Sequence, residues 1–248
     1  MNGASTAEVM AVVLSRALRD GDVVVMGTNA TIPRAAALLA QRRGKLRVVT
    51  LVGAFGTVDP TTPAAPASGA DPAFLPGRLA SSLGTVVGDQ VRGLADVIVL
   101  GALQVDRRGR LNLTVVGDYH RPALRGPGTV GLSLVASVRR TFLFLTRHDT
   151  RTFVEGVDFV SAEGLRPDGR GIDVIVTPLA VLGPDARGER IDLVSVHPGW
   201  SFADVQERTG FALDPCGARP TAAPTAEELE ALRSFADGRR LAGLVVGS

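Results

Sequence analysis

The stretch Val23-Val24-Val25-Met26, followed after a helical segment by Arg47-Val48-Val49-Thr50-Leu51-Val52, decides the fold class of this 248-residue chain. Both runs are short and mostly apolar, which is typical of strands buried on both faces of a sheet. The helix expected over 34–43 joins them, so the two strands are parallel and the crossover between them is right-handed. We therefore predict an α/β fold with a mostly parallel central sheet flanked by helices.

The segments on either side continue this alternation. Ser5-Thr6-Ala7-Glu8 and Thr225-Ala226-Glu227-Glu228 have the form of capping boxes, so a helix is predicted from each, the second running to about 237. With no internal repeat and no break in composition, the chain is predicted to form a single domain over 1–248. The remaining predicted elements are strands at 96–103, 141–146, 152–153, 174–181 and 192–196, a hairpin turning at 106–110, and helices near 89–94 and 132–139.

Residues 57–76 differ from the rest, because Pro, Ala, Thr, Ser and Gly dominate them without any periodicity. We expect a long irregular excursion there. Such excursions on α/β folds often act as lids or binding loops, and a plain surface insertion has the same composition. Both interpretations stay open.

Composition excludes several classes of protein. Hydrophobic residues make up 45% of the chain and charged residues 21%, which excludes intrinsic disorder, and the single cysteine, Cys216, excludes a disulfide scaffold. One cysteine also predicts a reducing, cytoplasmic setting. No apolar run approaches the roughly 20 residues that span a membrane, and the N-terminal segment contains acidic residues unlike a signal peptide, so no membrane association is expected.

The charge pattern argues against a nucleic-acid partner. The pI is about 9.3, although the net charge is only +2. Lys45 is the only lysine among the 27 basic residues, and acidic residues are interspersed with the arginines. A nucleic-acid-binding domain would gather its cations into a patch. Aromatic residues are only 4% of the chain, too few for base-stacking platforms.

Two common catalytic and ligand-binding motifs do not occur. There is no G-x-x-x-x-G-K-[ST] phosphate loop and no G-x-S-x-G elbow. His120, His148 and His197 are far apart in the sequence, so each is assigned a structural role and no metal site is predicted. Glu155 and Asp158 could form an acid/base pair only on a helix, and their segment is predicted to be extended or turning.

Two glycine-containing loops are the best candidates for ligand contacts. Gly27–Pro33 and Gly126–Gly131, the first and second glycine loops, each lie between an apolar strand and a helix. Backbone N–H groups at the start of a helix suit an anion or an oxyanion. The same glycines also suit a tight turn between strand and helix, so the residues alone leave both roles open.

The order of several segments is more specific than any single motif. Asp22–Gly27 is followed by Ala95–Asp106, Gly117-Asp118-Tyr119, Phe153–Phe159 and Ser195-Val196-His197-Pro198-Gly199. In this order they resemble the β-subunit of class I CoA-transferases, especially the glutaconate CoA-transferase type. The resemblance implies that a homologous α-subunit is the partner in a heterodimer or heterotetramer, with the active site near the interface between the two chains. It also implies coenzyme A or acyl-CoA as substrate and no tightly bound cofactor.

One departure from the family pattern bears on the chemistry. In these transferases a β-subunit glutamate attacks the thioester and then carries CoA as a glutamyl thioester. The resemblance places Leu51 at that position, and no Glu or Asp occurs between Asp22 and Asp59. A leucine side chain forms no acyl intermediate. Two further departures are Val130, where the family has glycine, and Pro178, where it usually has Asp.

These departures favour a β-like subunit of a heteromeric enzyme that acts on an acyl-CoA thioester by hydrolysis, C–C cleavage or a related route, as steroid-ring-opening hydrolases of the superfamily do. A conventional CoA-transferase whose carboxylate comes from Glu155 or the α-subunit is the first alternative. A non-catalytic subunit that completes the partner's site is the second. Leu51 and Phe55 are expected to line an apolar pocket. The residues expected to contact substrate or CoA are Gly27, Asn29, Thr31, Gly53, Phe55, Gln104, Gly128 and Gly131.

Overall fold

The computed structural model divides into two compact units, residues 1–100 with 223–248 and residues 101–222. The single domain predicted over 1–248 stays a prediction. The described residues are 3–26, 30–44, 47–52, 55–60, 77–82, 88, 93, 95–129, 132–215, 219–234 and 245, with the backbone alone for 47–52, 55–60, 77–82 and 133. The predicted positions that lie outside them are Gly27, Asn29, Gly53, Gly131, Cys216 and most of the helix near 89–94.

The first unit is built around the predicted strand–helix–strand segment. β1 (Val23–Met26) lies between β2 (Arg47–Val52) and β5 (Val97–Leu100) and is parallel to both. Val24, Val25 and Met26 are buried, as expected for a strand covered on both faces. The predicted bounds of β1 and β2 are confirmed.

Two further strands extend this sheet, so the predicted irregular excursion is wrong at its start. β3 (Phe55–Pro60) pairs antiparallel with β2, and β4 (Gly77–Ser82) pairs antiparallel with β3, giving the order β5-β1-β2-β3-β4. Two residues separate β2 from β3, the commonest length for a hairpin loop. The β-branched Thr57 and Val58 favour a strand, but their signal is lost in a composition averaged over 20 residues. Residues 61–76 lie outside the described part.

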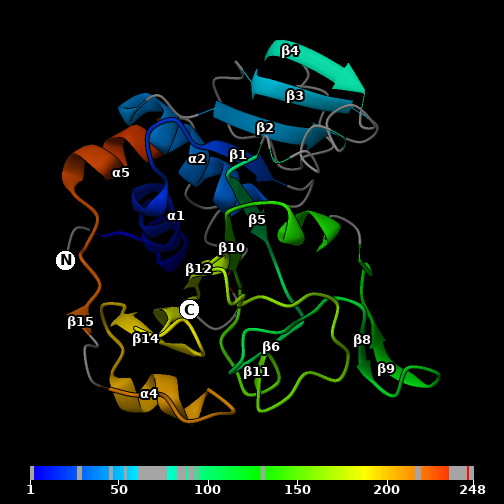
Figure 1. The fold of residues 1–248 in the computed structure, drawn as a ribbon. Coiled ribbons are helices and arrows are strands. Elements are labelled where there is room, and N and C mark those ends of the chain that lie inside the picture. The colour runs from blue at the N-terminus through cyan, green and yellow to red at the C-terminus, as the bar shows by residue number, and fades with distance from the viewer. Residues whose placement is uncertain are drawn as a thin grey trace. The chain divides into compact units, whose positions relative to one another are not determined.

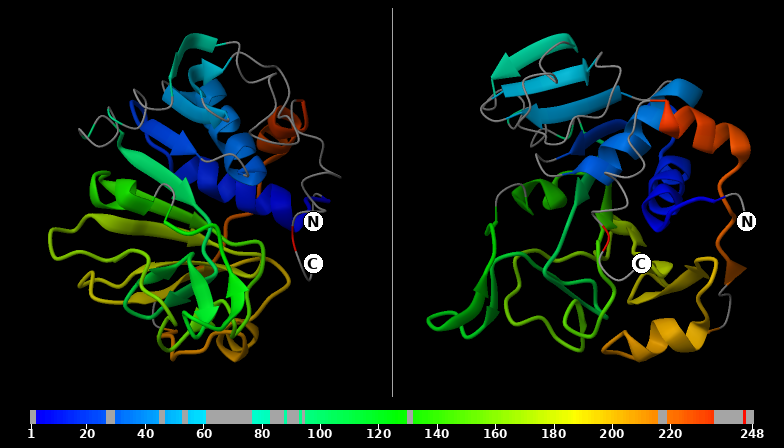
Figure 2. Two further views of the ribbon diagram at one scale, coloured as in Figure 1. Left: turned by 90° about the vertical axis from the view of Figure 1, so that its right-hand side faces the viewer. Right: turned by 180° about the vertical axis from the view of Figure 1, so that it is seen from behind.

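Three helices of the first unit pack on one another (Figure 1; Figure 2). They are α1 (Thr6–Ala17), α2 (Thr31–Arg43) and α5 (Ala226–Arg233), and α2 also contacts β1 and β2. Both predicted capping boxes are confirmed, because each N-cap hydroxyl accepts the N–H of a glutamate whose carboxylate accepts the N-cap N–H. α2 begins three residues earlier than predicted, and α5 ends earlier.

The same two glutamates join α1 to α5. Glu8, at the start of α1, accepts from Nε of Arg233 at the end of α5, with an N–O distance of 2.7 Å. Glu228, at the start of α5, accepts from Nη2 of Arg16 at the end of α1 at 2.6 Å and from Nη1 of Arg43 at 3.0 Å. Each carboxylate lies at a helix N-terminus, where the helix dipole favours it. Burial opposes ionisation of Glu8 and Glu228, but their arginine and capping partners still lower the pKa of both.

The strands of the second unit follow the order β15-β14-β13-β12-β10. β10 (Arg140–Phe144) is parallel to β12 (Gly171–Val176), and β13 (Ala180–Pro184) and β14 (Ile191–Val196) follow as antiparallel neighbours. The short β15 (Arg219–Pro220) is parallel to β14. Thus the strands predicted at 141–146 and 192–196 are confirmed within two residues.

The single strand predicted at 174–181 is wrong, because the chain turns between β12 and β13. The Thr177 hydroxyl oxygen accepts the N–H groups of Leu179 and Ala180, which fixes the turn. Pro178 has no N–H to donate to a strand ladder, so it cannot continue the sheet. The uninterrupted apolar character of the segment conceals this turn.

Two small sheets complete the strands of the second unit. β11 (Phe153–Val154), β6 (Gln104–Asp106) and β7 (Leu111–Asn112) form one, and the predicted hairpin at 106–110 joins β6 to β7. β8 (Val115–Gly117) and β9 (Pro122–Arg125) form a hairpin that extends away from the rest of the unit in Figures 1 and 2.

Two short helical segments of the second unit differ from prediction. A 3₁₀ helix over Leu132–Ala136 replaces the longer helix predicted over 132–139. α4 (Phe202–Glu207) was not predicted, although Ser201 and Asp204 form its capping box. The α/β class, with parallel central strands and flanking helices, is nevertheless confirmed. In the described part of the chain, no helix has the length and apolarity to cross a membrane.

Candidate functional site

The carboxyl end of β1 and β2 is where the resemblance places the family's nucleophile. Thr50 lies opposite Met26, the last residue of β1, so Leu51 is one residue beyond that end. Leu51 is paired with Gly56 in β3, and Phe55 with Val52. Ligands of parallel α/β sheets bind beyond the carboxyl ends of the strands. Residue 51 therefore lies at the carboxyl ends of the strands, where a substrate is expected. The side chains of Leu51 and Phe55 lie outside the described part.

Two carboxylates of the first unit lie at the opposite ends of these strands. Asp22 precedes β1, and its Oδ2 accepts the N–H of Arg19 at 2.7 Å. Asp96 precedes β5, and its Oδ2 accepts the N–H of Val23 at 3.0 Å. A strand of four residues is about 13 Å long. Neither carboxylate can therefore substitute for a nucleophile at the Leu51 end of the sheet.

A buried cation lies in the first turn of α2, directly after the first glycine loop. Thr31 begins this helix, and the Arg34 side chain is 1% exposed. Burial lowers the pKa of Arg34 to about 10, so the guanidinium remains charged at neutral pH. Sequence reasoning missed Arg34, because an arginine in an alanine-rich helix usually indicates a solvated face. A cation held in the first turn after a glycine loop suits an anionic ligand.

The second glycine loop rests against the segment between β7 and β8. The N–H of Gly128 donates to the Leu113 carbonyl at 3.0 Å, and the N–H of Gly126 donates to the Thr114 carbonyl at 2.9 Å. Gly128 has φ +82°, which favours glycine. Because the Gly128 N–H already has an acceptor, free oxyanion donors of this loop must come from later residues. The ligand role predicted for Gly128 stays a prediction.

Gln104 belongs to a network of polar side chains that includes the buried Asn112 and the exposed Asp158. Its Oε1 accepts from Nδ2 of Asn112 at 2.7 Å and from the Asp158 N–H at 3.0 Å, and its Nε2 donates to Oδ2 of Asp158 at 3.0 Å. The same Asp158 oxygen accepts the Gly117 N–H at 2.8 Å. Gln104 is only 4% exposed. The structure therefore gives it a scaffold role, and the substrate contact predicted for Gln104 stays a prediction.

Glu155 and Asp158 are both exposed but differ in their hydrogen bonds. Glu155 is exposed in the turn after β11. Asp158 is engaged with Gln104 and Gly117, so its carboxylate acts as a link between β6 and the start of the β8–β9 turn. The segment is not helical, as predicted. An exposed carboxylate in water has an ordinary reactivity, so Glu155 as a nucleophile would need a partner chain to desolvate it.

His148 is buried between two threonine hydroxyl groups. Its Nδ1 lies 2.8 Å from Thr177 Oγ1, which accepts the Leu179 and Ala180 N–H groups and donates to the Ala180 carbonyl at 3.0 Å. Thr209 Oγ1 donates to the Val205 carbonyl, so it accepts the proton of His148 Nε2 at 3.0 Å. Burial lowers the pKa of His148 to about 3.

His197 is similarly buried beside the same turn. Its Nδ1 is 2.9 Å from Thr221 Oγ1, which is 2.8 Å from Ser195 Oγ. Its Nε2 is buried without a hydrogen-bond partner among the described residues. Burial lowers the pKa of His197 to about 4. Neither histidine suits acid/base catalysis near neutral pH, for which a pKa near 7 is needed. The described residues include no cluster of three His, Cys, Asp or Glu able to hold a metal ion.

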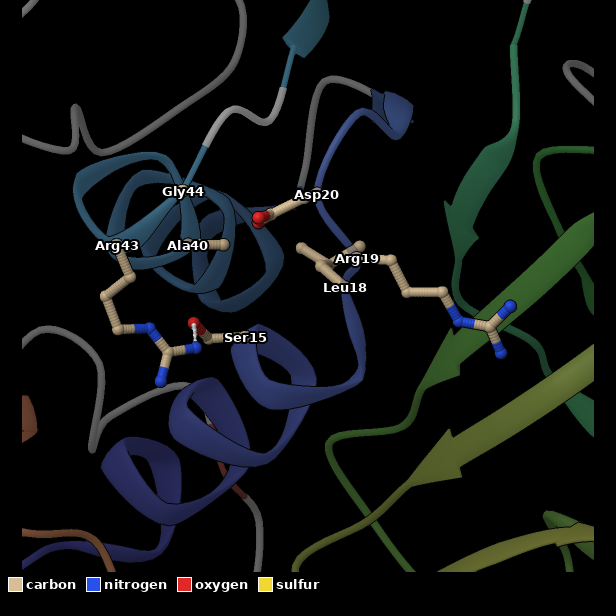
Figure 3. A pocket seen from close by; sticks show the side chains of 7 residues that line it. All are labelled: Ser15, Leu18, Arg19, Asp20, Ala40, Arg43 and Gly44. Atoms are coloured by element: carbon tan, nitrogen blue, oxygen red, sulfur yellow. Dashed lines mark hydrogen bonds between the residues drawn. The ribbon is translucent and has the colours of Figure 1, made fainter.

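A pocket of about 250 Å³ lies in the first unit between the ends of α1 and α2 (Figure 3). Arg43 Nη2 donates to Ser15 Oγ at 2.8 Å on one side, and the Asp20 carboxylate lies against Gly44 on the other. None of the residues predicted to contact substrate lines this pocket, and Leu18, Arg19 and Ala40 complete its wall. It is therefore separate from the candidate site.

The sequence matches the coenzyme A transferase family over residues 7–208. The chain belongs to this family. It is 35% identical to the B subunit of 3-oxoadipate CoA-transferase from Pseudomonas knackmussii, over 95% of this chain and 94% of that protein. It is also 35% identical to the IpdB subunit of the cholesterol ring-cleaving hydrolase of Mycobacterium tuberculosis, over 58% of this chain and 61% of that protein.

Solved structures of this family share the fold. The decarboxylase AibA/AibB is 29% identical with a TM-score of 0.87, over 97% of this chain and 98% of that one. Glutaconate coenzyme A-transferase from Acidaminococcus fermentans is 26% identical with a TM-score of 0.85, over 97% and 98%. The predicted resemblance to CoA-transferase B subunits is thereby confirmed. Enzymes of this family use CoA thioesters as substrates.

Proposed function

We propose that this chain is the B-type subunit of a cytoplasmic two-subunit enzyme that acts on an acyl-CoA thioester without forming a glutamyl-CoA intermediate of its own. Leu51 carries this proposal, because it lies at the carboxyl end of the β1–β2 pair and the chain has no acidic residue from 23 to 58. Relatives that include a ring-cleaving hydrolase and a decarboxylase support a reaction other than CoA transfer. Acyl-CoA is then a substrate, and no tightly bound cofactor is required.

The residues suit binding more than covalent catalysis. In the first unit, the apolar residue types at positions 51 and 55 suit an acyl group. In the second unit, backbone N–H groups of the second glycine loop suit an oxyanion. Arg34 adds a positive charge beside the first glycine loop, suited to the anionic parts of the ligand. The group that takes or gives a proton comes from the homologous A-type subunit, because the two buried histidines of this chain remain neutral at pH 7.

Introducing the missing carboxylate tests this proposal. The two-subunit complex is incubated with glutaryl-CoA and acetate, and the formation of acetyl-CoA is compared with the release of free CoA. We expect the wild type to release CoA or cleave the acyl group without exchange. Leu51→Glu should gain measurable exchange, while the uncharged control Leu51→Gln should not. Efficient exchange by the wild type, unchanged in Leu51→Gln, would contradict the proposal.

A conventional CoA-transferase is the second candidate, favoured by the 35% identity to a 3-oxoadipate CoA-transferase polypeptide over nearly the whole chain. In that case another carboxylate carries CoA, either Glu155 or one from the A-type subunit. Glu155→Gln would then abolish exchange without preventing assembly of the two subunits. The matched control is Glu163→Gln, a change in another acidic residue of the same unit. Equal exchange in both variants would remove Glu155 from consideration.

A further inference from the structure

Asn112 is an amide with every hydrogen-bonding group in use and no exposed surface. Its Oδ1 accepts the N–H groups of Thr114 at 2.9 Å and Val115 at 3.2 Å. Its Nδ2 donates to Gln104 Oε1 at 2.7 Å and to the Val115 carbonyl at 2.6 Å. Asparagine is disfavoured in strands, and this one lies in β7 between Leu111 and Leu113. The four hydrogen bonds of its side chain offset this unfavourable preference.

These bonds fold residues 112–115 into a tight turn that presents two carbonyl groups on one side. The carbonyls of Leu113 and Thr114 accept the N–H groups of Gly128 at 3.0 Å and Gly126 at 2.9 Å. A Cβ at Gly126 would overlap the Leu113 carbonyl oxygen, so the two backbones are in direct contact. The start of the second glycine loop, Gly126–Thr129, therefore takes its place from the Asn112 turn.

The turn is held from its other side as well. Ser161 Oγ accepts the Leu113 N–H at 3.0 Å and lies 2.7 Å from Thr114 Oγ1. Gln104 is prevented from rotating its amide, because Asp158 binds its oxygen through the N–H and its nitrogen through the carboxylate. The Gln104 oxygen consequently faces Asn112, and only a donor at that position satisfies it.

We propose that Asn112 is a positioning residue that sets the backbone of Gly126–Thr129 and thereby the thioester bound by the second glycine loop. That this loop binds a thioester rests on the proposed function. A buried amide suits this task because it supplies two donors and two acceptors without adding a charge behind a loop that faces an anion.

Two mirrored substitutions test this role. Asn112→Asp keeps Oδ1 but replaces the donating Nδ2 by an oxygen that faces the Gln104 oxygen and the Val115 carbonyl. Asp192→Asn, the control, lies in the same unit, is also buried, and keeps the Oδ1 that accepts from Leu193 and Asp214 while losing its ion pair with Arg190. Hydrogen exchange of the full chain is measured at Gly126 and Gly128, and kcat and KM of the two-subunit complex are measured with glutaryl-CoA.

Asn112→Asp is expected to speed exchange at Gly126 and Gly128 by about 10-fold, since the loss of about 1.4 kcal/mol of local stability changes an equilibrium by that factor. It should lower kcat about 100-fold with a smaller change in KM, because a displaced loop misplaces the reacting group. Asp192→Asn should leave both measurements at wild-type values.

Each result decides one point. The proposal is overturned if hydrogen exchange at Gly126 and Gly128 is no faster in Asn112→Asp than in Asp192→Asn. Faster exchange with unchanged kcat limits Asn112 to stabilising the fold and also overturns it as a positioning residue. A wild-type complex inert toward glutaryl-CoA counts against the proposed function alone, because the exchange comparison needs no substrate and still decides whether Asn112 holds the loop.

Discussion

In the first unit, Glu8 and Glu228 bind arginines of a neighbouring helix, whereas in the second unit Asn112, Gln104 and buried hydroxyls bind chiefly through uncharged groups. The charged contacts join α5 to α1 and to the end of α2. The uncharged contacts lie directly behind the loop expected to face an anionic thioester. Asn112 adds no charge behind the loop, so it does not oppose the charge of the ligand. The carboxylate of this network, that of Asp158, binds Gln104 and the Gly117 N–H.

The largest effect that separates the two units is a response to acid, because His148 and His197 are buried in the second unit. The lowered pKa values of His148 and His197 mean that the unfolded chain binds protons that the folded chain does not. The free energy of unfolding is therefore fully retained above about pH 6.5 and falls by about 1.4 kcal/mol per pH unit for each histidine as the pH drops toward 4. Glu8 and Glu228, whose pKa is lowered, lose their contribution only below about pH 4.5.

Urea unfolding between pH 7 and 4.5 measures this response. His148→Gln and His197→Gln should each reduce the pH dependence, although both will be less stable than the wild type at pH 7. The control is His120→Gln, which changes an exposed histidine in the β8–β9 turn. If all three variants keep the wild-type pH dependence of the free energy of unfolding, the assignment of the acid response to His148 and His197 is wrong.

Removal of a shared carboxylate should have the next largest effect. Glu228→Ala leaves Arg16 and Arg43 without this partner and removes half of the α5 capping box. We expect the free energy of unfolding to fall by about 3 kcal/mol. Glu230→Ala, an exposed change on the same helix, should cost less than about 0.5 kcal/mol. Equal losses in urea denaturation would show that the ion pairs do not fasten α5.

Which elements of the fold could be predicted from the sequence depends on whether a local pattern or a specific hydrogen bond determines them. β1 and β2 were predicted at their exact bounds because a buried parallel strand is a continuous apolar run. The strand predicted at 174–181 failed because the Thr177 turn is set by a hydroxyl that binds two backbone N–H groups. Composition cannot report such a bond.

The candidate site was predictable only in part, for a similar reason. The resemblance to the family places Leu51 at the nucleophile's position from its neighbours in the sequence, and this assignment stays a prediction. The role of Asn112 depends on Gln104, eight residues away, and on Gly126 and Gly128, which the chain brings back after the β8–β9 hairpin. The sequence signal for this role was an asparagine flanked by leucines, because the amide of a buried asparagine must find hydrogen-bond partners.

Two turn glycines of the second unit test the contribution of packing instead of charge to stability. Gly109, in the β6–β7 turn, has φ +75°, and an added Cβ would be 2.7 Å from Leu165 Cγ. Gly109→Ala should cost roughly 2.5 kcal/mol, combining left-handed backbone strain with overpacking. Gly188→Ala has a similar φ of +71° but open space around it, so it should cost only about 1 kcal/mol. Thermal unfolding of the two variants measures this gap, and equal losses would contradict the close packing at Gly109.

The smallest expected effect is that of salt. Raising NaCl to 1 M should reduce the Arg16–Glu228 coupling energy, obtained from a double-mutant cycle, by about 0.5 kcal/mol, because the Arg16 side chain is partly exposed. The Gln104–Asn112 coupling energy should not change, since neither group is charged. Equal salt dependence of the two coupling energies would remove the distinction between the networks.

The central claim is that this chain acts on an acyl-CoA thioester without carrying CoA itself. The most direct measurement is the mass of the chain after the two-subunit complex has been incubated with glutaryl-CoA and treated with borohydride, which reduces a glutamyl thioester to a stable alcohol. The account predicts an unmodified mass for this chain while glutaryl-CoA is consumed. A reduced glutamate mapped to any position of this chain would contradict it.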